Sequence, residues 1–380
     1  MRAYLSKQSA AGCRVPALVV AGALLAVVMA GCLPGPRLTV TTQASGLTNP
    51  WDVAFADGTM IYTERPGRVT AVVDGQKRLL AAPTDVVQAS EAGMMGLAVD
   101  PSFSSNRFVY TCFASTRGGP ANDVRLVRWR VNTGFTTLTD RTDIVTGAPV
   151  NASGQLGRHS GCRPRFGLDG ALWVGTGDAA VGTVPQDPAS LGGKILRVTR
   201  DGSPAAGNPG GGLDPRIWSY GHRNVQGLAF RASDGLAVNT EHGPGIDDEI
   251  NRLSQGNFGW DPVGPGGAYN EAVPMTDLNK FPSAVPSLWR SGSPTLAPSG
   301  ATFLHGTRWD GWDGALAVTM LKGQQLLVLA FNGDGRMTGV AVALTDQGRL
   351  RSAVLGPDGN LYVTTDNGGT SDTILKVVPG

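Results

Sequence analysis

The chain has 380 residues, of which 41% are hydrophobic and only 16% are charged, so it can bury a core and is not intrinsically disordered. Its 54 glycines and 25 prolines interrupt the chain too often for a helical bundle and predict an all-β fold of short strands joined by turns. The formal net charge is +2 without any basic block, which argues against a nucleic-acid partner.

The N-terminal residues have the pattern of an export signal. Basic residues precede an apolar run over 15–29, which is too short to span a bilayer comfortably and ends in Met29-Ala30-Gly31-Cys32. This ending resembles a bacterial lipobox, in which the cysteine thiol is lipidated and becomes the new N-terminus. We therefore expect an exported lipoprotein that Cys32 anchors to the extracytoplasmic side of a membrane. An ordinary secretory signal, without lipid, is the alternative.

This interpretation divides the chain into three segments. Residues 1–31 are the lipoprotein signal peptide, residues 32–40 are a linker from the lipid anchor, and residues 41–380 are the functional domain. An oxidising compartment permits a disulfide between Cys112 and Cys162, the two thiols left in the domain, but the sequence leaves this pairing open. The absence of C-x-x-C spacing and a total of four histidines argue against a zinc or haem site.

One local pattern recurs along the mature chain: an apolar strand, an Asp-Gly turn and a second apolar strand. A further unit without Asp-Gly joins the apolar segments at 95–99 and 108–110. Together these six units predict a six-bladed β-propeller, in which each hairpin is the inner part of one blade. The Asp-Gly turns are Asp57-Gly58, Asp169-Gly170, Asp234-Gly235, Asp313-Gly314 and Asp358-Gly359.

A propeller of this size needs a closure and leaves room for long loops. We expect Leu38-Thr39-Val40 to pair with the last blade and close the ring. Insertions over 115–160, 179–215 and 261–295 are rich in Gly, Pro, Ser, Asn or Asp, which predicts loops on the ring and not separate domains. Loops of this length on a compact ring usually carry function.

The first candidate site is a histidine and an aspartate that flank one predicted hairpin. His159 precedes its first strand and Asp178 follows its second strand. A hairpin returns both flanks to the same end of a blade, so the two side chains can become neighbours. A carboxylate beside an imidazole fixes its tautomer and raises its basicity, as a general base requires. The alternative is a surface histidine near a turn aspartate.

Three further stretches carry polar side chains suited to a ligand. The run over 218–227 is costly to bury unless it binds something. The loop over 241–249 offers oxygen ligands for a hard cation such as calcium, although without EF-hand spacing, and a solvated acidic turn is the alternative. Near the C-terminus, Lys322 is followed by Arg349 and Arg351, which share a strand face and would repel unless an anion lies between them. Solvated surface charges are the alternative for these cations.

Taken in order, these stretches resemble the glucose/sorbosone dehydrogenase family, the soluble PQQ-dependent aldose sugar dehydrogenases, over nearly all of the mature chain. The resemblance implies a six-bladed propeller that oxidises the C1 hydroxyl of aldoses to lactones with calcium-bound PQQ and passes electrons to an external acceptor. Besides the His159 stretch, it is carried by GLTNPWDVAF at 46–55, TERPG at 63–67, GMMGLA at 93–98, SLGGKILRV at 190–198, YGHRN at 220–224 and DDEIN at 247–251.

The same resemblance implies a role for individual residues. His159 would be the base that takes the proton of the sugar C1 hydroxyl, Asp178 would orient it, and Arg223 would stabilise the charge that develops on the quinone oxygen. The implied cofactor contacts are Asn224 and the cations that hold the PQQ carboxylates, Lys322, Arg349 and Arg351. The implied calcium ligands are the carbonyls of Gly243 and Pro244 beside PQQ, and Glu249 in a second, structural calcium site.

The chain departs from the family pattern mainly around the sugar. Glu91 stands where glucose-oxidising members commonly have glutamine, so we expect it to contact the substrate. Gly161-Cys162 replaces the usual Gly-Gly, and Val225 replaces a proline. No C-x-x-C-H haem motif is present, so electrons must leave to a separate carrier. The sequence names neither the sugar nor the carrier, and it leaves the oligomeric state open.

Two other classes of function stay open at this stage. A non-catalytic propeller lipoprotein that acts as a binding or scaffold module would be marked by lost cations or a blocked channel. A calcium-dependent propeller hydrolase of the lactonase type would need several carboxylate or amide side chains directed at one metal on the axis. The retained cations disfavour the first, and the mostly backbone oxygens of Gly243-Pro244 disfavour the second.

Overall fold

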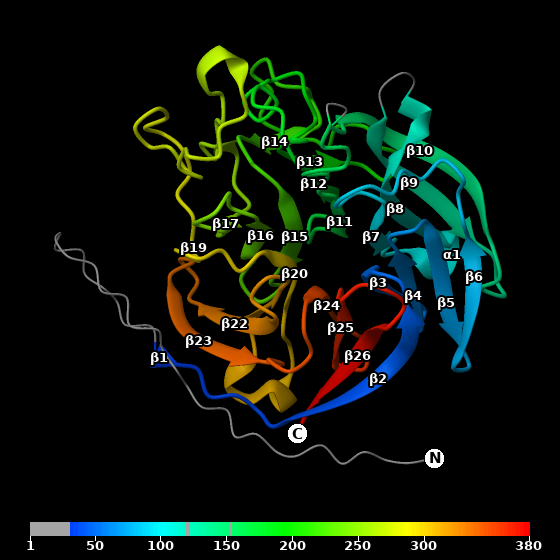
Figure 1. The fold of residues 1–380 in the computed structure, drawn as a ribbon. Coiled ribbons are helices and arrows are strands. Elements are labelled where there is room, and N and C mark those ends of the chain that lie inside the picture. Colours follow the sequence, from blue (N-terminus) through cyan, green and yellow to red (C-terminus); the bar gives the residue numbers. More distant parts are fainter. Residues whose placement is uncertain (1–30, 119–121, 152–153) are drawn as a thin grey trace.

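The structure is a computed structural model that describes residues 31–118, 122–151 and 154–380. Residues 1–30, which hold all but the last residue of the predicted signal peptide, lie outside this part. The strands form six sheets arranged around one axis, which confirms the predicted all-β, six-bladed propeller (Figure 1). Within the described residues the only α-helix is the single turn α1 (Phe103–Asn106).

Each blade is built around an antiparallel meander of three or four consecutive strands. The first blade contains β3 (Pro50–Ala56), β4 (Thr59–Glu64), β5 (Arg68–Val73) and β6 (Gln76–Ala81), and the second contains β7 (Met94–Val99), β8 (Phe108–Ser115), β9 (Asp123–Val131) and β10 (Leu138–Pro149). The third contains β11 (Arg163–Phe166), β12 (Leu172–Gly175), β13 (Lys194–Val198), β14 (Ile217–Tyr220) and the short β18 (Gly256–Asn257).

The remaining three blades follow the same plan. The fourth contains β15 (Val225–Phe230), β16 (Ala237–Glu241), β17 (Glu249–Arg252) and β19 (Trp289–Arg290). The fifth contains β20 (Pro298–Phe303), β21 (Leu316–Met320), β22 (Gln325–Phe331) and β23 (Met337–Ala343), with β1 (Gly31–Cys32) on its edge. The sixth contains β24 (Leu350–Leu355), β25 (Leu361–Thr365), β26 (Asp372–Pro379) and β2 (Leu38–Leu47). Short 3-10 turns are η1 (Thr116–Gly118), η2 (Pro265–Gly267) and η3 (Thr307–Trp312).

The Asp-Gly turns lie where the repeats predict them. Each of the five joins the first strand of a blade to the second, and the unit without Asp-Gly joins β7 to β8. The six first strands contact one another in turn around the axis, so these hairpins are the inner parts of the blades. Glycine permits this close approach: a Cβ on Gly96 of β7 would lie 2.3 Å from Pro164, and one on Gly300 of β20 would lie 2.6 Å from Ser352.

Burial follows from the position of a strand within its blade. Inner strands such as β7 are buried on both faces because neighbouring blades cover them, and they are almost continuously apolar. Six apolar clusters fill the six interfaces between blades. Outer strands such as β10 face solvent on one side. Their sequences therefore mix buried apolar residues with exposed Asp, Thr and Arg residues.

The polar outer strands correct one prediction. The segment over 115–160 is not a loop, because it contains β9 and β10, and the segment over 179–215 contains β13. Their charged and hydroxyl residues belong to strands with one solvent-facing side, which composition alone does not distinguish from loops. The segment over 261–295 is mostly loop, as predicted, apart from η2 and β19.

The two ends of the described chain meet in the sixth blade. Leu38, Thr39 and Val40 pair with Pro379, Val378 and Val377 of β26, which confirms the predicted closure of the ring. The strand β2 therefore begins within the segment predicted as a linker. Before it, Gly31 and Cys32 pair in parallel with β23, and the Cys32 side chain is exposed on the outer edge of the fifth blade. Among the described residues no helix is long and apolar enough to cross a membrane.

Candidate active site

The predicted pair of His159 and Asp178 forms in the structure. The imidazole Nδ1 lies 2.8 Å from Asp178 Oδ1, and both side chains are buried. His159 lies just before β11 and Asp178 just after β12, so the β11–β12 hairpin brings them together as expected. Burial opposes ionisation of Asp178, but its hydrogen bond and charge interaction with His159, together with Arg223 and Tyr269, lower the pKa of this carboxyl.

The segment that carries Asp178 is held by a buried lysine. Lys194 of β13 is fully buried, and its Nζ donates to the carbonyls of Val184, Pro185 and Gly192 at 2.7–3.0 Å. These carbonyls belong to the loop between Asp178 and β13, so the lysine fixes the path of that loop. Burial lowers the pKa of Lys194 to about 7.

The second oxygen of Asp178 is held by the long loop that follows the fourth blade's β17. Trp260 Nε1 donates to Asp178 Oδ2 at 2.8 Å, and the Tyr269 hydroxyl donates to the same atom at 2.7 Å. The Tyr269 hydroxyl is also 3.3 Å from His159 Nδ1. Asp178 thus faces the imidazole with one oxygen and the loop with the other. Tyr269 belongs to the predicted loop segment over 261–295, and Trp260 directly precedes that segment.

Arg223 contacts the same loop. Its Nη1 donates to the carbonyl of His242 at 2.9 Å, and its Nη2 forms an ion pair with Glu271. Glu271 also pairs with Arg158 at 2.7 Å. The loop therefore contacts both parts of the predicted catalytic group: Tyr269 contacts the His159–Asp178 pair, and Glu271 contacts the arginine.

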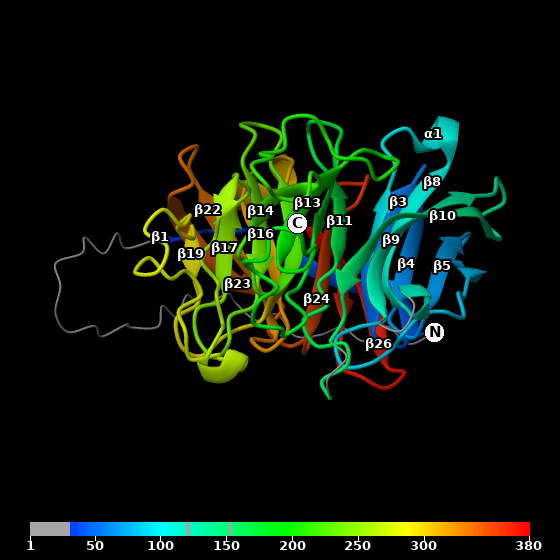
Figure 2. The same ribbon diagram turned by 90° about the horizontal axis from the view of Figure 1, so that it is seen from above.

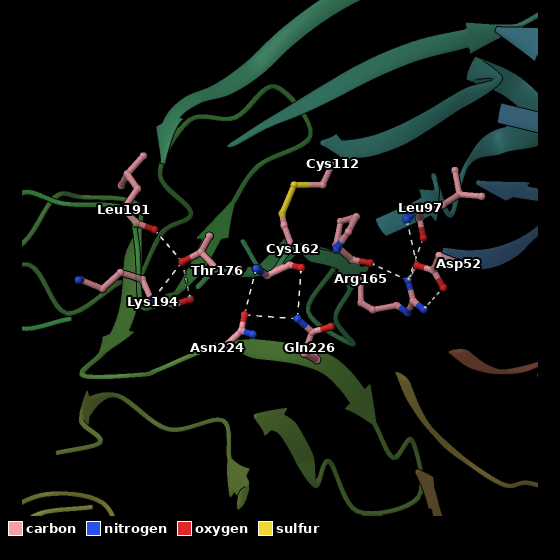
Figure 3. The surroundings of a disulfide bond; sticks show 12 residues. Asp52, Leu97, Cys112, Cys162, Arg165, Thr176, Leu191, Lys194, Asn224 and Gln226 are labelled. Atoms are coloured by element: carbon pink, nitrogen blue, oxygen red, sulfur yellow. Dashed lines mark hydrogen bonds and ion pairs between the residues drawn. A yellow bond between two sulfur atoms is a disulfide. The ribbon is translucent and has the colours of Figure 1, made fainter. Parts of the chain in front are cut away.

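Asn224 connects the catalytic group to Glu91. Asn224 Nδ2 donates to Glu91 Oε2 at 2.7 Å, while its Oδ1 accepts from the Gly161 amide and from Gln226 Nε2 (Figure 3). Burial opposes ionisation of Glu91, but the charges of His159 and His242 and the amide of Asn224 lower the pKa of this carboxyl. Glu91 is thus positioned beside the base that the sequence predicts.

The structure joins Cys112 of β8 to Cys162 in a disulfide (Figure 3). Cys162 directly precedes β11 and follows Gly161, whose amide and carbonyl interact with Asn224 and Gln226 of the next blade. The bond therefore ties the segment that carries His159 to the second blade, while Asn224 and Gln226 tie it to the fourth.

A cavity of about 450 Å³ opens beside this group. Its walls include Glu91, Gln226 and His242, which connect it directly to Asn224 and Arg223. Three arginines also line it: Arg65, Arg349 and Arg351. Arg351 is buried and forms an ion pair with Asp366 at 2.6 Å, whereas Arg349 is half-buried and donates to the carbonyls of Asp366 and Leu321.

The structure does not bring Lys322 into the lining of this cavity. Its side chain is exposed, and Nζ donates to Thr295 Oγ1 at 3.0 Å. Leu321, the preceding residue, does line the cavity, so the chain approaches the site but the lysine points elsewhere. Arg65, which belongs to the TERPG motif at 63–67, lines the wall that Lys322 was expected to share.

The loop that contains Gly243 and Pro244 is closed by Asp248. Asp248 Oδ1 accepts from the Gly243 amide at 2.9 Å, and Oδ2 accepts from the amides of Leu296 and Ala297. In the part of the chain that the structure describes, no group of three His, Cys, Asp or Glu side chains is arranged to hold a metal. Any cation here would therefore depend on backbone and amide oxygens as well.

Glu249 lies opposite another buried carboxylate. Glu249 of β17 pairs in register with Glu241 of β16, and Asn251 pairs with Asn239 on the same face two residues away. Burial and the charge of Glu241 raise the pKa of Glu249 to about 8. The Oδ1 atoms of Asn239 and Asn251 are buried, and neither has a hydrogen-bond partner.

These features lie on one face of the ring. In the edge-on view of Figure 2, the loop with η2 and the chain on either side of 152–153 project from the same face. A buried His–Asp pair beside an arginine-lined cavity is the arrangement of an enzyme that moves a proton next to an anionic ligand. This is the class of site that the comparisons with known proteins specify further.

The Glucose / Sorbosone dehydrogenase family model matches residues 47–376. The aldose sugar dehydrogenase YliI of Escherichia coli is 30% identical over 353 residues, which cover 88% of this chain and 91% of that protein. Quinoprotein glucose dehydrogenase B of Acinetobacter calcoaceticus is 26% identical, with 86% and 84% coverage. The PQQ-bound aldose sugar dehydrogenase of Streptomyces coelicolor superposes with a TM-score of 0.73 at 29% identity, over 91% of this chain and 99% of that one.

The chain therefore belongs to the glucose/sorbosone dehydrogenase family, as its motifs indicated. The fold supports this independently, because the cofactor-free aldose sugar dehydrogenase of Escherichia coli superposes with a TM-score of 0.78 at 28% identity, over 90% of this chain and all of that one. The protein is a sugar dehydrogenase.

Sequence reasoning missed the residues that complete the site from a distance. In the sequence, Trp260 lies 82 residues and Tyr269 lies 91 residues from Asp178, and Glu271 lies 48 residues from Arg223. No spacing rule connects positions so far apart. The available signal was an aromatic and an acidic residue within the polar loop over 261–295. Their partners follow only from how the loop packs.

Proposed function

We propose that this chain is an exported quinoprotein that oxidises the C1 hydroxyl of aldose sugars to the lactone, with PQQ as hydride acceptor and a separate protein or molecule as electron acceptor. The observation that carries the proposal is the buried His159–Asp178 pair next to a cavity lined by three arginines. PQQ bears several carboxylates, and guanidinium groups bind carboxylates with matched geometry.

The residues present fit such a cofactor. The cavity volume of about 450 Å³ lies in the range of small-molecule sites. Arg65 Nε is buried without a partner, and Arg349 reaches only backbone carbonyls, so both have charge available for an anion. Arg349 and Arg351 would hold carboxylates, Asn224 would contact the cofactor, and Lys322 could join them only by turning toward the cavity. When bound, PQQ supplies the carbonyl group that accepts hydride.

His159 is the proton acceptor in this proposal. Because Nδ1 faces the ionised Asp178, that nitrogen carries the proton and Nε2 is left with a lone pair. Nε2 takes the proton from the sugar C1 hydroxyl while the C1 hydride leaves, and Asp178 stabilises the imidazolium that forms. Arg223 places a permanent positive charge at the same site and stabilises negative charge there. Glu91, beside Asn224, contacts the sugar hydroxyls.

Calcium has two proposed positions. The carbonyls of Gly243 and Pro244 would hold one ion, which as a Lewis acid would polarise the cofactor. Glu249, with Glu241 and the unpartnered Oδ1 atoms of Asn239 and Asn251, would hold a structural ion that offsets two buried carboxylates. The paired carboxylates and orphaned amide oxygens support this second position, because hard cations take such ligands.

We further propose that residues 1–31 are cleaved as a lipoprotein signal and that Cys32 carries the lipid on the extracytoplasmic face of a membrane. The lipobox-like sequence supports this, as does the exposure of Cys32 at the ring edge. Mass spectrometry of the membrane fraction is the test. A diacylated N-terminal Cys32 is expected, whereas an unmodified mature chain in the soluble fraction would contradict the anchor.

The activity test uses the purified mature protein without lipid. We expect dye reduction that requires PQQ, calcium and an aldose, and that disappears when a chelator is added. Dye reduction without PQQ, or PQQ binding with no response to any of a broad panel of aldoses and with hydrolysis of lactones instead, would contradict the proposal. A panel that includes hexoses, pentoses and disaccharides would also rank the substrates.

A further inference from the structure

Arg65 lines the cavity, but its guanidinium has no protein partner in the described residues. It directly follows β4, lines the cavity together with Arg349 and Arg351, and is half-buried there. No ion pair within 4.0 Å and no side-chain hydrogen bond is formed by its guanidinium in the described residues, and its Nε is buried without a partner. A guanidinium in such a position is costly unless a ligand uses it.

The backbone of Arg65 is fixed on both sides. Its amide donates to the carbonyl of Asn49 at 3.1 Å, and its own carbonyl accepts from the Met94 amide at 3.0 Å. The side chain crosses Gly93, where a Cβ would lie only 2.4 Å from Arg65 Cγ. Gly93 has a φ of 153°, so both its conformation and its missing side chain give the arginine this path. The packing over Gly93 thus directs the guanidinium into the cavity.

The charges around Arg65 leave room for an anion. Burial is the main cause that lowers the pKa of the Arg65 guanidinium, and the positive charges of Arg351 and Arg349 lower it further. Asp366 is the nearest compensating carboxylate, but both of its Arg351 contacts go to Oδ2 while Asn49 occupies Oδ1. Three guanidiniums therefore share one carboxylate that is already engaged, with Glu91 bound to Asn224 farther along the wall.

We propose that Arg65 is a cofactor-binding residue and provides, with Arg349 and Arg351, the third cationic contact to the carboxylates of the quinone. The inference rests on the proposed function, because it assigns a ligand group to the same cavity. It changes the predicted set of contacts, since Lys322 is exposed and bonded to Thr295 whereas Arg65 is directed inward.

The test is a titration of calcium-loaded mature protein with PQQ, followed by cofactor absorbance and protein fluorescence, without sugar or dye. Arg65→Met should weaken PQQ binding at least about tenfold, because a charge-assisted contact is lost. Lys322→Met should change it less than about threefold. Arg78→Met is the matched control, since Arg78 is on the outer strand β6 and donates to the carbonyl of Gly134 far from the cavity.

Two further measurements separate ligand contact from folding. Arg65→Lys keeps the charge and should recover part of the affinity, and all variants should keep the wild-type melting temperature within a few degrees. The trimethyl ester of PQQ lacks the carboxylates. The ester should bind weakly to wild type, and Arg65→Met should weaken ester binding little further. The two changes are then not additive, as expected if Arg65 contacts a PQQ carboxylate.

The possible failures are distinguishable. Wild-type protein that binds no PQQ overturns the proposed function and this inference with it. If wild type and Arg65→Met bind PQQ equally well, the inference alone is overturned. It is also overturned if PQQ affinity falls in Lys322→Met and not in Arg65→Met. Equal losses of ester and acid binding in Arg65→Met would show that the arginine acts on the fold of the cavity and not on the carboxylates.

Discussion

The orientation of one imidazole ring depends on residues from three parts of the chain. Asp178 accepts from His159 Nδ1, and its other oxygen is occupied by Tyr269 and Trp260 from the loop beyond β17. These donors stop the carboxylate from rotating, so Oδ1 stays on the imidazole and Nε2 stays free for the substrate. The proposed role of His159 as proton acceptor therefore depends on neighbours that hold Asp178 in place.

Removing the Tyr269 hydroxyl should weaken the hold on Asp178. Tyr269→Phe should lower kcat about tenfold, because a hydrogen bond to a charged group is lost and Asp178 is held less firmly. PQQ affinity should stay unchanged, because Tyr269 does not line the arginine cavity. Steady-state kinetics with a cofactor titration gives both values. An unchanged kcat with weakened PQQ binding would contradict the positioning role.

The carboxylate itself makes a larger contribution. Asp178→Asn keeps the shape of the side chain but presents an amide that favours the wrong imidazole tautomer, so kcat should fall by about 10²- to 10⁴-fold. Binding of PQQ, followed by absorbance, should change little. Activity within a few-fold of wild type would show that Asp178 does not set the tautomer of His159.

At the scale of elements, the β11–β12 hairpin connects the catalytic pair to the rest of the ring. Cys162 links its start to β8, and the carbonyl and amide of the neighbouring Gly161 interact with the fourth blade. The opposite end of the site depends on a long loop without regular structure apart from η2 and β19. The segment that carries His159 is thus tied to two neighbouring blades, while the part that contacts Arg223 is a loop.

The disulfide should contribute to stability more than to chemistry. The double substitution Cys112→Ala with Cys162→Ala should lower the free energy of unfolding by about 2–4 kcal/mol. The reason is that the disulfide closes a loop with a sequence separation of 50 and so restricts the unfolded chain. Denaturant unfolding with and without a reducing agent tests this. The reducing agent should destabilise wild type and leave the double variant unchanged, and a variant as stable as oxidised wild type would contradict the prediction.

The proposed structural cation site at Glu249 is tested by thermal melting in the absence of cofactor. Calcium should raise the melting temperature of wild type, and a chelator should reverse the increase, because the ion binds the folded state alone. Glu249→Gln should abolish the response to calcium. Asp248→Asn is less suitable as a control because Asp248 closes the neighbouring loop, so Glu271→Gln serves instead. Equal responses in wild type and Glu249→Gln would rule out the site.

Much of this architecture could be predicted from the sequence. Asp-Gly turns mark local hairpins, which depend on adjacent residues, and one such hairpin correctly predicted that His159 and Asp178 become neighbours. The orientation of Lys322 could not be predicted, because a side chain that follows a strand end can turn toward or away from the axis. The inward path of Arg65 could not be predicted either, since it depends on its packing over Gly93.

At the scale of the whole molecule, one buried carboxylate joins several of the inner strands. Asp52 of β3 forms ion pairs with Arg163 and Arg165 of β11 at 2.6 and 2.8 Å. It also accepts from the Leu97 amide of β7 at 3.0 Å and from Ser352 Oγ of β24 at 2.7 Å. Four of the six inner strands, β3, β7, β11 and β24, therefore meet at Asp52.

The protonation of Asp52 gives a pH prediction. Burial opposes its ionisation, but Arg163 and Arg165 dominate in combination and lower the pKa from its ordinary 3.8 to about 2. A lowered carboxyl pKa contributes stability above 3.8 that is lost as pH falls through about 2. Unfolding curves of wild type should therefore shift toward lower stability between pH 4 and pH 2.

Removing the charge by substitution should destabilise the protein most where wild-type Asp52 is ionised, well above pH 2. Asp52→Asn should cost about 3–5 kcal/mol at pH 7, because Arg163 is left buried without its partner. The difference between the variant and wild type should shrink as pH approaches 2. Chemical denaturation across this range measures it, and a constant difference at every pH would contradict the role given to the Asp52 charge.

We propose that His159 accepts the proton when an aldose is oxidised in this ring. The most direct measurement is a stopped-flow experiment in which protein loaded with PQQ and calcium is mixed with excess aldose and no external electron acceptor. We predict rapid reduction of the cofactor in wild type, and reduction at least about 10²-fold slower in His159→Ala, with PQQ bound equally well by both. Reduction of the cofactor in His159→Ala at the wild-type rate would contradict the account.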